Sequence, residues 1–183
     1  MKIKRMINAD IVLESNFWKR NINNPKLYIN KKLKKIQTFP ILKKKLKVFT
    51  VLLTDNLKMK YLNKKFRKKN KPTDVLSFPF YSVEELKKNK DKKIYLGDIA
   101  ISYQFVKKRS NSSSFEIEFD KLWLHGYLHL LGYDHIKNSD YFKMKKIEDK
   151  ILKNFNKKIE KNNKFFFYNL LVITFCFRYS YRI

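Results

Sequence analysis

All three histidines of this 183-residue chain lie within eleven consecutive residues. If the stretch before Gly132 is helical, His125 and His129 are four residues apart and project from one face of the helix. Gly132 stands where a helix commonly ends, because a residue without Cβ adopts the left-handed conformation at little cost, so the chain can turn and bring His135 toward the other two. Three protein ligands leave the fourth position of zinc open, as in catalytic sites, whereas structural zinc sites are usually closed by four ligands. The spacing therefore predicts one Zn²⁺ ion per chain, held by His125, His129 and His135.

The alternative interpretation gives the histidines ordinary structural roles in a helix and a turn. Clustering argues against it, because three histidines placed at random would share such a window in roughly one chain in a hundred. The spacing also resembles the metzincin peptidase pattern H-E-x-x-H-x-x-G-x-x-H, with Gly126 in place of the general-base glutamate. A zinc peptidase needs that carboxylate to take a proton from the attacking water and pass it to the leaving amine, and glycine can do neither. Peptidase activity is therefore the least favoured alternative.

Further blocks of sequence accompany the histidine segment: Leu62-Asn63 with Phe66-Arg67, Pro72 to Pro79, Leu96 to Ser102, and Met144, Glu148, Ile151 and Leu152 after it. In order and spacing, these blocks and the segment HGYLHLLGYDH resemble the YbeY family of metal-dependent endoribonucleases, which are rRNA maturation factors. The resemblance covers roughly residues 1–156, which are expected to form one domain. Residues 157–183 are expected to be a separate extension, rich in lysine and aromatic residues and of unknown role.

The resemblance implies a single-strand-specific, metal-dependent endoribonuclease that processes the 3′ end of 16S rRNA and acts in ribosome quality control. It implies rRNA and the small ribosomal subunit as partners. It also implies that Arg67 and His125 are catalytic, with the planar guanidinium of Arg67 binding the scissile phosphate or stabilising the charge of the transition state. By composition alone, an arginine in a basic run more often faces solvent. A ribosome-assembly factor that binds RNA around a structural metal, without cleaving it, is the alternative function.

Two carboxylates are weaker candidates for the site. Asp98 and Asp134 could each orient the second ring nitrogen of a histidine ligand or accept a proton. Either could equally cap a turn.

The charge of the chain points to a polyanionic partner. Lys and Arg number 43 against 16 Asp and Glu, which gives a formal charge of +27. A field of this size attracts nucleic acid, and runs of lysine suit phosphate contacts that position RNA without reading its sequence. A bias toward A- and T-rich codons is an explanation of equal weight, since it would raise lysine on every solvated surface.

Compartment and membrane signals agree on a cytoplasmic location. Cys176 is the single cysteine, so no intramolecular disulfide can form. The first residues lack the apolar core of a secretory signal. The apolar run from Phe165 to Phe177 is thirteen residues long, too short for a bilayer crossing of about 20 residues. We therefore expect no stable association with a membrane, and an added strand or an extension for this run.

The pattern predicts an α+β fold, a small mixed sheet of about four strands covered by helices, one of which is a zincin-like metal helix. Apolar and β-branched runs predict strands within 2–14 and at 47–54, 74–80 and 94–102, and Pro79 places the third at an edge or strand end. Apolar periodicity predicts helices at 25–39, 56–68, 114–131 and 139–156, with 82–93 as a charged surface connection.

Three details of the helices are also predicted. Ser113 followed by Glu116 indicates a capping box at the start of the metal helix. An apolar stripe on that helix includes Gly126, which would allow close packing. The residues expected to face inward on the last helix are Tyr141 or Phe142, Met144, Ile147, Ile151 and Phe155.

Overall fold

The computed structural model describes residues 7–36, 46–134 and 138–156. The predicted ligand His135 and the predicted extension at 157–183 lie outside the described residues. Within the described ranges, no helix combines the length and apolar character needed to cross a membrane.

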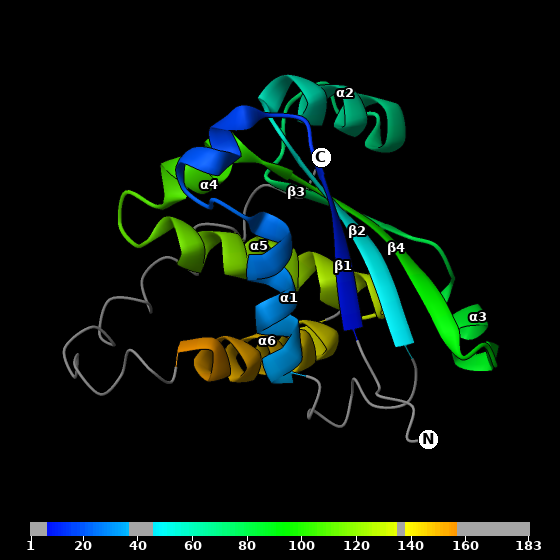
Figure 1. Cartoon of the computed structure of the whole chain (residues 1–183). Coiled ribbons are helices and arrows are strands. Elements are labelled where there is room, and N and C mark those ends of the chain that lie inside the picture. The colour runs from blue at the N-terminus through cyan, green and yellow to red at the C-terminus, as the bar shows by residue number, and fades with distance from the viewer. Residues whose placement is uncertain (1–6, 37–45, 135–137, 157–183) are drawn as a thin grey trace.

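The described strands form one mixed sheet in the order β1-β2-β4-β3 (Figure 1). Strand β1 (Ile7–Leu13) pairs in parallel with β2 (Leu46–Thr54), and β2 pairs in parallel with β4 (Lys93–Ser102). Strand β3 (Val75–Pro79) runs antiparallel to β4 and forms one edge of the sheet. The α+β class, the four-stranded mixed sheet and the edge position of Pro79 are thus confirmed.

Each helix predicted from periodicity is present: α1 (Pro25–Ile36), α2 (Asn56–Arg67), α5 (Phe115–Leu130) and α6 (Asn138–Asn156). Three short helices were missed by the sequence prediction: η1 (Asn16–Arg20), α3 (Val83–Lys88) and α4 (Tyr103–Arg109). Helix α3 corrects the expectation of a plain connection at 82–93. The Ser82 side chain accepts the N–H of Glu85, and the Glu85 carboxylate accepts the N–H of Ser82, a capping box that holds the first turn.

The two faces of the sheet are covered by different helices. Alternate residues of a strand point to opposite faces. Ile99 and Ile101 of β4 belong to the large core shared with α1, α5 and α6. Ala100, between them, packs instead with Leu76 of β3 and Met59 of α2. Helix α2 therefore covers the face of the sheet opposite α5, and Figure 1 shows it apart from the group of α1, α5 and α6.

The two edges of the sheet also differ. The Asn30 side chain of α1 accepts the N–H of Ala9 and donates to its C=O, each at 2.9 Å. This side chain takes the place of a neighbouring strand, so the outer edge of β1 is occupied there. At the other edge, no strand among the described residues pairs with the outer side of β3.

Helix α6 packs on α5 and α1 with the side chains that its periodicity predicts, except in the first turn. Met144, Ile151 and Phe155 are buried. Tyr141 and Phe142 are 39% and 67% exposed, so the expectation that one of them faces the core is wrong. Their rings contact each other edge-on, with centroids 5.5 Å apart. The buried side chains of this helix begin with Met144, in the following turn.

Candidate metal centre

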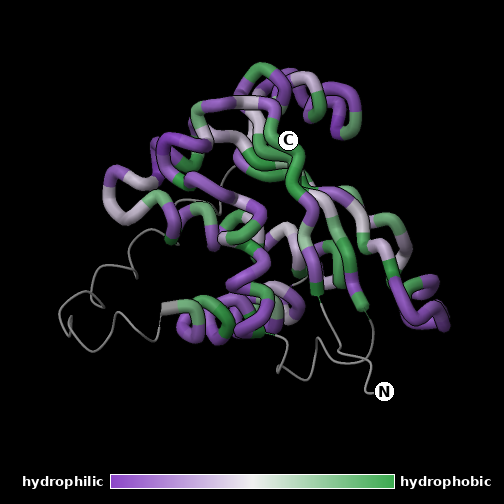
Figure 2. The backbone as a smooth tube through the Cα atoms, in the orientation of Figure 1, coloured by the Kyte–Doolittle hydropathy of each residue, from purple (hydrophilic) through white to green (hydrophobic). Residues whose placement is uncertain are grey.

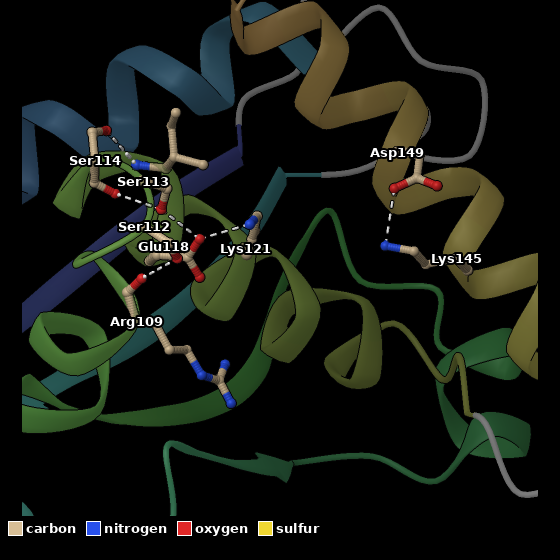
Figure 3. A network of polar contacts seen from close by, with 9 residues as sticks. Arg109, Ser112, Ser113, Ser114, Glu118, Lys121, Lys145 and Asp149 are labelled. Atoms are coloured by element: carbon tan, nitrogen blue, oxygen red, sulfur yellow. Dashed lines mark hydrogen bonds and ion pairs between the residues drawn. The ribbon is translucent and has the colours of Figure 1, made fainter. Parts of the chain in front are cut away.

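Serine side chains fix the start of α5, the helix that carries two of the predicted ligands. Ser114 is the N-cap, and its hydroxyl accepts the N–H of Ile117 at 3.2 Å. Ser113 instead donates to the Glu118 carboxylate at 2.7 Å (Figure 3). The predicted capping box of Ser113 and Glu116 is therefore wrong, because the helix begins one residue later than that pairing requires.

His125 and His129 converge as their spacing predicts. Their Nε2 atoms lie 3.1 Å apart, and their rings are nearly perpendicular at 78°. Two imidazoles bound to one tetrahedral zinc ion, each at about 2.0–2.1 Å, would hold their nitrogens about 3.3 Å apart. The two ring nitrogens thus stand at the separation that a shared cation requires, so the residues present fit a metal ion.

Glu148 of α6 holds the other nitrogen of His125. Its Oε1 lies 2.7 Å from His125 Nδ1, and its side chain is only 13% exposed. A carboxylate that accepts the Nδ1–H leaves the lone pair of a neutral imidazole on Nε2, facing His129. No role in the site was predicted for Glu148. The sequence did contain a signal for it, because Glu148 lies between Met144 and Ile151 on the buried stripe of α6. Burying a carboxylate without a partner at such a position would cost free energy.

Gly126 faces the sheet at close range. A Cβ at this position would stand 2.8 Å from Cγ2 of Ile99 and 3.1 Å from Oγ of Ser77. This confirms the expectation that the glycine serves close packing. The geometry also accounts for the absence of the metzincin glutamate, since even its first side-chain carbon would clash with the branched side chain of Ile99.

The end of α5 turns back as its glycine predicts. Gly132 has a φ of +85°, its N–H donates to the C=O of His129, and the N–H of Tyr133 donates to the C=O of Leu128. This pair of hydrogen bonds is a Schellman motif, which ends the helix within one turn of His129. The chain then leads through Asp134, which is exposed, to His135, whose placement is outside the described residues.

Arg67 and Asp98 lie away from the histidine face of the sheet. Arg67 is exposed in the last turn of α2, on the opposite face. Asp98 accepts a hydrogen bond from the hydroxyl of Tyr95. It pairs across the ladder with Phe78, which packs toward α2, and cross-strand partners share a face. The possible role of Asp98 in orienting a histidine therefore finds no support here.

The structure thus brings together His125 and His129, adds Glu148, and leaves Arg67 apart from them in the last turn of α2. Within residues 7–36, 46–134 and 138–156, no group of three histidine, cysteine or carboxylate side chains has the arrangement of a metal site. The predicted set needs His135 as its third member, so this result does not test the set.

Comparison with known proteins places the chain in a family. The family model of endoribonuclease YbeY matches residues 13–156. An endoribonuclease YbeY of Pelagibacter ubique is 48% identical over 151 residues, which cover 81% of this chain and 95% of the relative. That of Buchnera aphidicola is 39% identical over 146 residues, covering 76% of this chain and 87% of the relative.

A solved structure agrees with the fold. The solution structure of a Thermotoga maritima protein superimposes with a TM-score of 0.54 at 25% sequence identity, over 86% of this chain and 93% of that protein. Its agreement extends over nearly all of both chains. The family model also spans the sequence blocks on both sides of the paired histidines. The chain therefore belongs to the endoribonuclease YbeY family.

Proposed function

We propose that the chain is a metal-dependent endoribonuclease of rRNA maturation whose single Zn²⁺ ion is bound by His125, His129 and His135. The observation that carries the proposal is the convergence of the Nε2 atoms of His125 and His129 at 3.1 Å. Endonuclease activity on RNA follows from the family. Imidazole ligands suit zinc, and three of them leave a coordination position open.

Different residues of the chain have different roles in the proposed reaction. A bound ion would polarise a phosphoryl oxygen and lower the pKa of its water. Glu148 keeps the imidazole of His125 in one orientation and tautomer. Arg67, exposed in the last turn of α2, would offer a planar pair of donors to the scissile phosphate. A catalytic role for Arg67 requires RNA to bridge the two faces of the sheet.

The substrate and partners follow from charge and family. With a formal charge of +27, the chain attracts polyanions such as RNA, and the family's role in rRNA maturation supports the small ribosomal subunit as the partner. We propose single-stranded segments of 16S rRNA near its 3′ end as substrate, acted on in the cytoplasm. Residues 1–156 supply the catalytic domain in this proposal, and 157–183 form an extension.

The test removes one ligand. His129→Ala leaves one of the paired nitrogens, so the zinc content of purified protein should fall from about one ion per chain to near zero. RNA cleavage should be lost, while RNA affinity stays within about threefold because it rests on lysines elsewhere. A variant that binds one equivalent of zinc with wild-type affinity overturns the metal site. Wild-type protein that binds zinc and RNA without cleaving would favour the assembly factor.

A second variant tests the arginine. Arg67→Lys keeps the charge but loses the bidentate fork, so cleavage should fall by at least about tenfold with RNA affinity nearly unchanged. Lys64→Arg, in the same helix, is the matched exchange in the other direction and should leave both unchanged. Equal losses of affinity and rate would make Arg67 a docking contact.

A further inference from the structure

Helix α2 and the segment that follows it are rich in cations. Between Asn56 and Thr73 the chain has no carboxylate and eight cations: Lys58, Lys60, Lys64, Lys65, Arg67, Lys68, Lys69 and Lys71. Lys58 is the member of this set that forms an ion pair with Glu14, at 3.3 Å. Figure 2 shows α2 as a mainly hydrophilic helix, with hydrophobic residues interspersed. Such a surface is complementary to a polyanion.

Aromatic rings stand among these cations. Tyr61 is 56% exposed and Phe66 is 54% exposed. The ammonium of Lys65 lies 5.9 Å from the centre of the Tyr61 ring and 5.3 Å from that of Phe66, and Lys58 lies 5.9 Å from Tyr61. Proteins that bind single-stranded nucleic acid combine exposed aromatic rings with lysines, because bases stack on the rings while phosphates contact the ammonium groups.

The position of Phe66 connects this surface to the metal centre. Its ring meets that of Phe78 on β3 edge-on, with centroids 5.0 Å apart. The next residue of β3 toward its start, Ser77, lies against Gly126 on the other side of the sheet. Only the edge strand β3 therefore separates Phe66 from the helix turn that carries His125. A flexible single strand that passes over this edge can reach both.

We infer that Tyr61 and Phe66, with Lys58 and Lys65, form a base-stacking platform for the single-stranded RNA that flanks the scissile phosphate. The inference rests on the proposed function and specifies the part of the substrate bound outside the metal centre. Stacking is tolerant of sequence, since every base has a π face, so the platform selects unpaired RNA rather than a particular sequence. A base-paired strand cannot offer its bases to the rings.

The experiment separates stacking from charge and from bulk. In the full-length protein, Tyr61→Leu with Phe66→Leu keeps apolar volume and every cation but removes both rings. Tyr61→Phe with Phe66→Tyr keeps both rings and is the matched control. Affinity is measured by fluorescence anisotropy on a 12-nucleotide unpaired RNA and on a base-paired duplex of the same length, with chelator present so that no cleavage occurs, and thermal melting checks the fold.

The leucine pair should lower the affinity for the 12-nucleotide RNA by at least about thirtyfold, because two stacked bases at about 1–3 kcal/mol each contribute about 2 kcal/mol or more. The salt dependence should be unchanged because no cation is lost. The control pair should stay within about twofold, and the duplex, whose bases are paired and cannot stack on the rings, should bind all variants alike. Wild-type affinity in the leucine pair overturns the inference, as does an equal loss in the control pair.

A further arm addresses acidic proteins as the occupant. If binding of polyglutamate falls by the same factor in the leucine pair, the surface serves polyanions in general and the stacking platform is wrong. Failure of the proposed function would appear elsewhere, as absence of RNA cleavage by the zinc-loaded wild type. Binding in the presence of chelator is independent of that result.

Discussion

The contact between Glu148 and His125 gives the sharpest quantitative prediction. Glu148→Gln keeps an oxygen that can accept the Nδ1–H at the observed 2.7 Å, but it removes the negative charge behind the imidazole. Loss of such a partner typically lowers metal affinity by about 10- to 100-fold. Because glutamine keeps the hydrogen bond, we expect about tenfold for Glu148→Gln, or about 1.4 kcal/mol, and about 100-fold for Glu148→Ala.

The assay is competition of the purified protein against a chelating dye for zinc, at fixed pH. Asp149→Asn is the matched control, since it neutralises a carboxylate one residue away that pairs with Lys145 at 3.0 Å (Figure 3). A general effect of charge on α6 would weaken zinc binding in both variants. A specific effect through His125 would weaken it only in the Glu148 variants.

Two results would refute this reasoning. Zinc affinity within twofold of wild type in Glu148→Ala would show that the carboxylate does not support the ligand. An equal loss in Asp149→Asn would assign the effect to the net charge of α6. Melting temperatures of the Glu148 variants, measured without metal, indicate whether any loss of affinity reflects unfolding.

Three further predictions concern packing, pH and domain limits. Gly126→Ala should lower the free energy of unfolding in urea by about 1 kcal/mol. Overpacking against Ile99 costs about 2 kcal/mol, and the higher helix propensity of alanine gains about 1 kcal/mol. In an Ile99→Ala background, the same substitution should have no such cost. Burial raises the pKa of Asp120 although Lys32 lies 2.6 Å away and lowers it. Because the pKa of the Asp120 carboxyl is higher in the folded state than in the unfolded state, this group stabilises the folded state below the unfolded pKa of about 3.9. That stabilisation is lost as the pH rises through the folded-state pKa. Lys32→Met raises the pKa of Asp120 further, so it should destabilise the protein by about 3 kcal/mol at pH 7 and by less at pH 4 in parallel urea titrations. Equal losses of stability at the two pH values would contradict the ion pair between Lys32 and Asp120. Deleting residues 157–183 should leave zinc content and cleavage near wild type, since the described core ends at Phe155, and a metal-free or unfolded truncation would contradict this.

The parts of the site that lie close together in sequence could be predicted. His125 and His129 are on one helix, where a spacing of four fixes their relation, and Gly132 gives the turn that follows. Glu148 lies 23 residues from His125 in sequence and reaches it only because α6 docks on α5. Periodicity identifies the buried stripe of each helix but does not say which stripes meet.

The position of Arg67 depends on the sheet rather than on local pattern. The sequence predicts α2, but the face that it covers is set by which side chains of β3 and β4 point toward Met59. A shift of one residue in the strands would exchange the two faces. The short helices were missed for a related reason: α3, with six residues, has no buried side chain and therefore no apolar period to detect.

The position of Gly126 bears on the choice between RNA and peptide chemistry. Amide hydrolysis needs a carboxylate on the reacting side of the metal to carry a proton to the leaving nitrogen. A side chain at 126 would have to displace Ile99, whose Cγ2 stands 2.8 Å from the Cβ position. Glu148 meets His125 at Nδ1, on the side of the ring away from Nε2, where it can orient the imidazole but cannot reach a group bound at Nε2. Phosphodiester cleavage depends chiefly on stabilising the negative charge of the phosphate, which cations supply. A site with a carboxylate behind its histidine and a cationic helix across the adjacent strand edge therefore suits phosphoryl transfer better than peptide hydrolysis.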